Sequence, residues 1–138
     1  MFHHSLPIQI RFSDVDRFGH VNNNAYFAYY DLGKQEYMRA VLGPDVFDSE
    51  IIPVVANINA DFFLPLHYGD TVCVETAVTH LGNKSFTLEQ QAVNIATGEV
   101  YCRCRTVMVC VRRSDGQSIP IPERSRRLIE EYEKGAAN

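Results

Sequence analysis

The 138-residue sequence has no tryptophan, only four cysteines and no excess of positive charge. With a formal net charge of -4, it lacks the cationic field that binding to a phosphate backbone requires, so we expect no nucleic-acid partner. No run of about 18 apolar residues occurs, and no basic start leads into an apolar stretch with a small-residue cleavage site. These absences predict a soluble cytoplasmic protein without a membrane partner.

The cysteines do not follow a pattern typical of disulfides or metal sites. Cys102, Cys104 and Cys110 share one parity within a β-like stretch, so they should point to one face of a strand, where disulfide geometry is poor. No Cys-x-x-Cys or His-x-x-x-His pair stands nearby to complete a zinc site. The pattern predicts reduced core thiols, no metal and no cofactor.

The first part of the chain predicts one strand and one helix. Apolar and polar residues alternate over residues 7–12, which suits a short, half-buried strand. Over residues 25–42 apolar side chains recur at three- and four-residue steps, which is helical, and Gly43 and Pro44 end the pattern. One of the three asparagines at 22–24 should cap the helix start. Apolar side chains also flank the main stripe, so the helix should be largely enclosed.

The second part predicts four longer strands, over residues 51–64, 71–81, 85–95 and 100–112. Their connections are short and rich in glycine or asparagine, so consecutive strands should pair antiparallel as a meander. A final stretch, about 122–134, has mixed charge and few apolar residues, and predicts an exposed helix with a frayed end.

These elements predict a single α+β domain over residues 1–138. The chain is 46% hydrophobic, which suffices for one core. Only the four long strands are available to bury the predicted helix, so the sheet should curve around it. The open strand edges should pair with a second copy of the chain.

A polar turn, SDVDRFGHVNNN, separates the first strand from the helix. Together with its flanks, the segment IRFSDVDRFGHVNNNAYFAYYDLGKQEYM resembles the hotdog-fold thioesterases of the 4-hydroxybenzoyl-CoA thioesterase-like family. The resemblance covers an aromatic at a strand end, an Asp-x-Asp pair, a glycine turn with His-Val-Asn-Asn, and a tyrosine-rich helix. It implies a curved antiparallel sheet around a central helix, hydrolysis of an acyl-CoA substrate, and a homodimer or homotetramer with sites between subunits.

The resemblance assigns the chemistry to the second aspartate, which is Asp16. It implies that Asp16 attacks the thioester carbonyl or activates water, while the Asn23 backbone N–H at the helix start polarises the carbonyl. An aspartate in such a turn, taken alone, would be interpreted as a residue that only shapes the loop. The surrounding motif favours the catalytic role for Asp16 and a structural role for Asp14.

The remaining site candidates belong to substrate binding or loop order. His20 could protonate the leaving thiolate, but we expect it mainly to order the loop, and Asn22 to act as cap. Tyr26 could line the acyl site, although an apolar helical stripe is more often core. Lys84 and Ser85 lie in the turn that approaches coenzyme A in the resembling enzymes. The second choice for binding its phosphates is an outward pair on one strand, Arg103 and Arg105.

Two other functions of this fold remain as alternatives. A non-catalytic module that binds acyl-CoA would not need the catalytic aspartate, so Asp16 argues against it. A hydratase or dehydratase resembling this family would carry a histidine within the central helix, and none occurs between Ala25 and Pro44.

Overall fold

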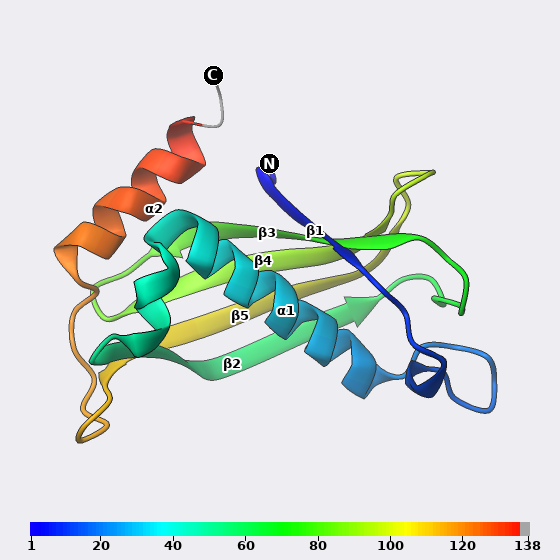
Figure 1. Ribbon diagram of the computed structural model, residues 1–138, viewed down its shortest axis with the longest axis horizontal. Coiled ribbons are helices and arrows are strands. Elements are labelled where there is room, and N and C mark those ends of the chain that lie inside the picture. The colour runs from blue at the N-terminus through cyan, green and yellow to red at the C-terminus, as the bar shows by residue number, and fades with distance from the viewer. Residues whose placement is uncertain (136–138) are drawn as a thin grey trace.

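The computed structural model describes residues 1–135 as a five-stranded antiparallel sheet with one long helix across one face and a second helix at one end (Figure 1). The order of strands in the sheet is β1-β3-β4-β5-β2. The predicted α+β arrangement is therefore confirmed. The strands are β1 (His4–Ile8), β2 (Ile51–Phe62), β3 (Val72–Leu81), β4 (Ser85–Asn94) and β5 (Val100–Arg112), and the helices are α1 (Asn23–Leu42) and α2 (Glu123–Gly135), with short 3-10 turns η1 (Phe12–Asp14) and η2 (Pro44–Asp48).

The long strands lie close to their predicted bounds, but the prediction for the first strand is wrong. β1 covers His4–Ile8 and pairs with β3, whereas residues 12–14 form η1 instead of a strand end. The alternation of apolar and polar residues continues on both sides of residue 7, so the pattern alone could not place the strand. Pairing with β3 decides which part becomes extended.

The predicted meander holds only for β3, β4 and β5. β2 pairs with β5, at the opposite edge of the sheet from β1, and does not pair with β3. Residues 63–71 form a long link instead of a hairpin: the amides of Phe63 and Leu64 still donate to the carbonyl of Tyr101 in β5 before the chain crosses to β3. The glycine-containing LHYGD segment lies within this link, so its turn residues serve a crossing between strands that are not neighbours.

Helix α1 buries one face against the sheet and leaves the other open. Tyr26, Tyr29, Tyr30 and Tyr37 are each 3% exposed or less, while Leu32 on the outer side is 52% exposed. The closest approach is at Gly33, where an added Cβ would lie 2.6 Å from Val74 Cγ1 of β3. The helix is thus enclosed on its sheet side only.

Helix α2 begins and ends within one residue of its predicted bounds, and its inner side is packed. Ile129 is 4% exposed, and Glu133 Oε2 accepts hydrogen bonds from the Tyr37 hydroxyl (2.5 Å) and from the Val78 backbone N–H (3.0 Å). The few apolar residues of this segment therefore form one stripe, and only its outer side is exposed. Neither helix within residues 1–135 is long and apolar enough to cross a membrane.

The two sheet edges differ in length and exposure. β1 has five residues and β2 has 12. On the α1 side of β2 the side chains of Val55, Ile58 and Phe62 remain 50%, 41% and 45% exposed, because α1 lies over the strands farther from that edge. Cys102, Cys104 and Cys110 point to the same α1 side and are buried free thiols, as predicted.

Candidate functional site

The turn that precedes α1 is built around Asp14. This carboxylate is 4% exposed and accepts hydrogen bonds from the Tyr29 hydroxyl (2.6 Å), the Arg11 backbone N–H (2.9 Å) and the Arg11 guanidinium (3.1 Å). Burial acts to raise the pKa of Asp14, but the hydrogen bonds from Tyr29 and Arg11 outweigh it and hold the pKa below its ordinary value of 3.8. Asp14 is thus an ionised structural residue, consistent with the role expected for it.

Asp16 lies in the same turn but is exposed. Its Oδ1 accepts from the backbone N–H groups of Phe18 (2.9 Å) and His20 (3.2 Å), while its own backbone N–H donates to the His20 carbonyl (2.8 Å). Gly19, with φ of 82°, lets the chain fold back so tightly that its N–H reaches the Asp16 carbonyl (3.0 Å). Within the described residues no hydrogen bond uses Asp16 Oδ2. One carboxylate oxygen therefore holds the turn, and the other is available for chemistry.

The start of α1 offers backbone donors beside Asp16. Asn22 is the N-cap: its side-chain oxygen accepts from the Ala25 N–H (2.9 Å), and its amide nitrogen donates to the Asp14 carbonyl (3.0 Å). The prediction that an asparagine caps the helix is confirmed, and Asn22 provides the cap. The next two amides, of Asn23 and Asn24, have no partner among the described residues. These amides stand where the helix dipole favours negative charge.

Asp16 and the start of α1 line one open cleft of about 590 Å³. The other wall of this cleft comes from the end of β2 and the first part of the 63–71 link. Tyr26 joins the two walls, since its ring meets that of Phe62 edge to face at 5.2 Å. Five of the predicted site residues thus lie together in this cleft. Asp16 and the asparagines form its polar part, and Tyr26 and Phe62 form its apolar back. The lining consists of Asp16, His20, Val21, Asn22, Asn23, Asn24, Tyr26, Phe62, Phe63, Leu64, Pro65 and Leu66.

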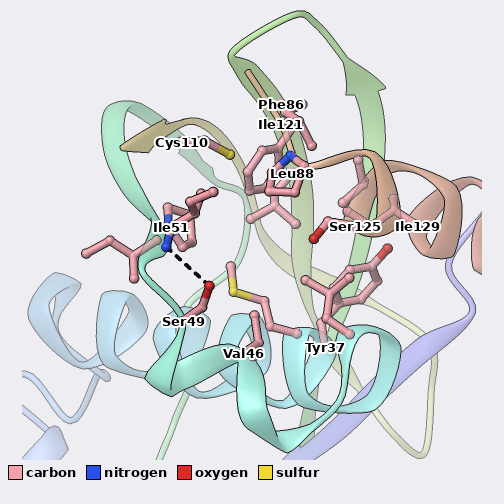
Figure 2. Close-up of a pocket in the computed structure, with 16 residues that line it drawn as sticks. Tyr37, Val46, Ser49, Ile51, Phe86, Leu88, Cys110, Ile121, Ser125 and Ile129 are labelled. Atoms are coloured by element: carbon pink, nitrogen blue, oxygen red, sulfur yellow. Dashed lines mark hydrogen bonds between the residues drawn. The ribbon is translucent and has the colours of Figure 1, made fainter. Parts of the chain in front are cut away.

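A second, enclosed cavity lies at the other end of α1 and is apolar. It has a volume of about 70 Å³ and is bounded by the ends of α1 and β5, by η2 and by the start of α2 (Figure 2). Its polar groups are few: Ser49 Oγ accepts from the Ile51 N–H (3.2 Å), the Tyr37 hydroxyl bonds Glu133, and the Ser125 hydroxyl and the Cys110 thiol complete the set. The lining includes no carboxylate or histidine that could activate water or a hydroxyl group, so the Asp16 cleft is the better candidate site.

A histidine that the sequence analysis left without a role lies against the candidate site. His67, in the link after β2, forms an isolated β-bridge with His20, and the two imidazole rings meet edge to face at 5.0 Å. His67 Nδ1 lies 3.7 Å from Asp70 Oδ2, which also accepts the His67 backbone N–H (2.9 Å). No spacing in the sequence indicates this contact, because it depends on where the link crosses the sheet.

Lys84 and Ser85 do not join Asp16 within one chain. They lie at the β3–β4 turn, where Ser85 pairs with Val109 and the Lys84 carbonyl accepts from the Cys110 N–H (2.9 Å), near the start of α2. The turn before α1, which contains Asp16, lies at the opposite end of the sheet (Figure 1).

Arg103 and Arg105 lie on the sheet face turned away from α1. The Arg103 guanidinium donates to Gln91 Oε1 (3.1 Å), and Arg105 stands opposite Glu89. Neither residue therefore lines the cleft. Among residues 1–135 no group of three or more His, Cys, Asp or Glu side chains is arranged to hold a metal ion.

Known proteins resemble this chain over nearly its whole length. The model of a family described as Thioesterase-like superfamily matches residues 10–129. The acyl-CoA thioester hydrolase YbgC of Escherichia coli O6:H1 is 22% identical over 107 residues, 76% of this chain and 79% of that protein. The PA5185 protein of Pseudomonas aeruginosa superimposes with a TM-score of 0.86 at 29% identity, covering 94% of this chain and 90% of that one. A Thermus thermophilus thioesterase complexed with coenzyme A and Zn gives a TM-score of 0.84 at 28% identity, covering 97% and 96%. The predicted hotdog fold is confirmed.

Proposed function

Since the chain belongs to the thioesterase-like superfamily, whose activity is thioester hydrolysis, we propose that it cleaves acyl-CoA at the cleft beside the start of α1, with Asp16 as its catalytic carboxylate. The observation that carries this proposal is the pairing, on one cleft wall, of a carboxylate oxygen without a partner and helix amides without partners among the described residues. The products are the free acid and coenzyme A.

The two groups match the two requirements of thioester hydrolysis. A carbonyl carbon needs an anionic attacker or an activated water, and its oxygen needs hydrogen-bond donors as negative charge develops there. Asp16 Oδ2 supplies the first, either by attack on the carbonyl or by removing a proton from water. The Asn23 N–H supplies the second, aided by the positive end of the α1 dipole. No metal is required for either role.

The turn is rigid enough to aim this chemistry. Asp16 Oδ1 is fixed by two backbone amides, and the loop behind it is tied to α1 through Asn22 and to Tyr29 through Asp14. Positioned groups of this kind gain their effect from geometry that is set before the substrate arrives. The apolar back of the cleft, formed by Tyr26 and Phe62, suits the acyl side of the thioester.

The function also involves a homodimer joined along β2. This edge is long, carries exposed apolar side chains and offers unpaired backbone groups along its outer side. Two-fold pairing of β2 with its copy would reverse the direction of the partner's strands. The partner's β3–β4 turn would then lie at the same end of the joined sheet as Asp16, about three strand spacings or roughly 15 Å across from β2. Lys84 and Ser85 of the partner subunit could thereby reach the anionic coenzyme A part of the substrate.

Asp16→Asn tests the catalytic assignment, because asparagine retains the turn-forming side chain but removes the negative charge. We expect turnover of an acyl-CoA panel, followed with a thiol-reactive dye, to fall by about two orders of magnitude or more, the scale on which positioned bases and nucleophiles act. The urea midpoint should hardly change, since asparagine still accepts the two backbone hydrogen bonds.

The matched control is Asp48→Asn, because Asp48 is an exposed aspartate in η2 at the far end of the molecule. It should leave both turnover and stability unchanged. A folded Asp16→Asn variant that hydrolyses at the parent rate would overturn the assignment. Binding of acyl-CoA by the parent protein with no turnover on any member of the panel would favour the non-catalytic binding module instead.

A further inference from the structure

His20 and His67 are joined by their backbones as well as by their rings. The Val21 N–H donates to the Leu66 carbonyl (2.8 Å), and a β-bridge links His20 with His67. The catalytic turn and the 63–71 link are therefore held together at this point. The two rings meet edge to face at 5.0 Å, and they are held in this contact because the backbones on both sides are hydrogen-bonded to each other. The contact joins two segments that are far apart in the sequence.

Only one of the two histidines lines the cleft. His20 lines the cleft, and its backbone also braces Asp16 Oδ1. His67 is not among the lining residues, so it meets His20 from outside the cleft. Asp70 is the next neighbour of His67, with Oδ2 at 3.7 Å from His67 Nδ1. Asp70, His67 and His20 thus form a row of neighbouring side chains, of which His20 alone lines the cleft.

We infer that His67 is a positioning residue that, with Asp70, holds the His20 imidazole to protonate the leaving sulfur. The inference rests on the proposed function and deepens it. The His67 ring limits the rotation of the His20 ring, and Asp70 anchors His67 by accepting its backbone N–H (2.9 Å). His20 is the group that touches the substrate, and His67 and Asp70 act through it.

The proton transfer belongs to the step in which the thioester bond breaks. The electron pair of the C–S bond goes to sulfur, and the His20 proton goes to the same sulfur, so that the thiol leaves in neutral form. The water that completes hydrolysis supplies a hydroxyl to the acyl carbon, and its other proton restores the protonated His20, by way of Asp16 in the route in which Asp16 removes that proton from water. The sum is thioester plus water giving carboxylic acid plus thiol, with no further reactant.

The test compares two esters of the same acyl group that differ in the leaving thiol. Coenzyme A leaves as an alkyl thiol and benefits from protonation, whereas a nitrothiophenyl ester leaves as a stable aryl thiolate and does not. We expect His67→Ala and His67→Gln to lower kcat for the acyl-CoA by about tenfold while leaving KM and the kcat for the aryl ester near the parent values. His20→Ala should show the same selective loss, and adding His67→Ala to it should cost little more.

His80→Ala is the matched control, since His80 is an exposed histidine on β3 near the opposite end of the sheet. It should leave both esters unaffected. Equal losses on both esters in the His67 variants would show that His67 only supports the fold and would overturn the inference, as would no loss on either ester. Asp16→Asn separates the two proposals, because it should abolish turnover of both esters whatever His67 does.

Discussion

Asp14 and Asp16 lie two residues apart in one turn, but their surroundings give the two carboxylates different hydrogen bonds and different exposure. Asp14 is buried and uses both carboxylate oxygens to hold Arg11 and Tyr29. Asp16 is exposed, and one of its carboxylate oxygens accepts the two hydrogen bonds that hold the turn. The same residue type therefore supplies the anchor of the loop and the carboxylate proposed for catalysis, and the two differ in their burial.

The charge of Asp14 should contribute measurably to stability. Asp14→Asn should lower the free energy of unfolding by about 1–3 kcal/mol at pH 7, because a buried carboxylate that accepts three hydrogen bonds becomes a neutral amide. The folded-state pKa of Asp14 lies below 3.8. The stabilisation is thus fully present above pH 3.8 and is lost as the pH falls through the lower folded-state pKa.

Urea denaturation of parent and variant at pH 7 and in acid measures this effect. The difference between the two proteins should shrink in acid, where Asp14 is itself protonated. The subtraction removes the contribution of other carboxylates, because both proteins contain them. A difference that stays constant from pH 7 into strong acid would show that the charge of Asp14 is not what stabilises the loop.

At this scale the sequence predicted the asparagine cap, because the cap depends on neighbours in the chain. The roles assigned to the candidate site residues stay predictions, although those of the turn and of the start of α1 lie together. Asp16, His20, Asn22, Asn23 and Tyr26 do line one cleft. His67 could not be predicted, since its contact with His20 arises only from the path of the 63–71 link. A sequence motif can identify residues that are close together in the chain. A contact between distant segments, such as that of His20 with His67, can be found only from the fold.

At the scale of elements, the cleft depends on how closely α1 lies on the sheet. The approach is closest at Gly33, where an added Cβ would be 2.6 Å from Val74 Cγ1, 3.2 Å from Gln90 Nε2 and 3.3 Å from Thr76 Oγ1. Gln90 Nε2 also donates to the Tyr30 carbonyl (2.9 Å) and to Thr76 (3.0 Å), which links helix and sheet through buried polar groups. Position 33 thus requires glycine, because the space between α1 and the sheet is too small for a Cβ atom.

Gly33→Ala should therefore destabilise the protein, although alanine is the better helix former by about 1 kcal/mol. We expect a net loss of about 1–3 kcal/mol in the free energy of unfolding, measured by urea denaturation, because the added methyl group forces α1 away from β3. In a Val74→Ala background the same change should cost less, since the nearest clashing atom is gone. A stabilising effect of Gly33→Ala in the parent would contradict the view that α1 packs too closely on β3 to accept a methyl group.

The sequence predicted the type of each long element but not the order of strands. Periodicity reports which face of a strand is apolar, and glycine-rich connections report where a chain can turn. Neither pattern distinguishes a hairpin from a link that crosses the sheet, and so β2 was expected beside β3 and lies beside β5. The position of β1 was equally underdetermined, because alternation extends beyond the five residues that pair with β3.

At the scale of the whole molecule, the proposed dimer can be tested by mass. The parent should sediment at twice the 15.7 kDa chain mass or a larger multiple. Ile58→Glu adds charge to the exposed apolar side of β2 and should shift the protein toward the monomer, whereas Ile95→Glu, at an exposed site in the β4–β5 turn, should not. A parent protein that sediments only as a monomer at micromolar concentration would contradict a site shared between subunits.

Mixing of variants tests whether the subunits share the site. Asp16→Asn and Lys84→Glu should each impair hydrolysis as separate homodimers. In a mixed dimer, one cleft combines Asp16 of the Lys84→Glu chain with Lys84 of the other chain, so the mixture should recover up to about a quarter of the parent activity after subunit exchange. No recovery in a mixture that contains mixed dimers would place Lys84 outside the site.

The unequal edges of the sheet also limit how far such pairing can go. β1 has only five residues, and Pro7 among them has no N–H to offer a further strand, whereas β2 extends for 12 residues although it also contains a proline, Pro53. A sheet with two equivalent edges could add copies without end and grow into a fibre. In the proposed dimer, two-fold pairing at β2 would leave the short β1 strands outermost on both sides. Strand addition would then end at the dimer, and the β2 edge would not become a seed for polymerisation.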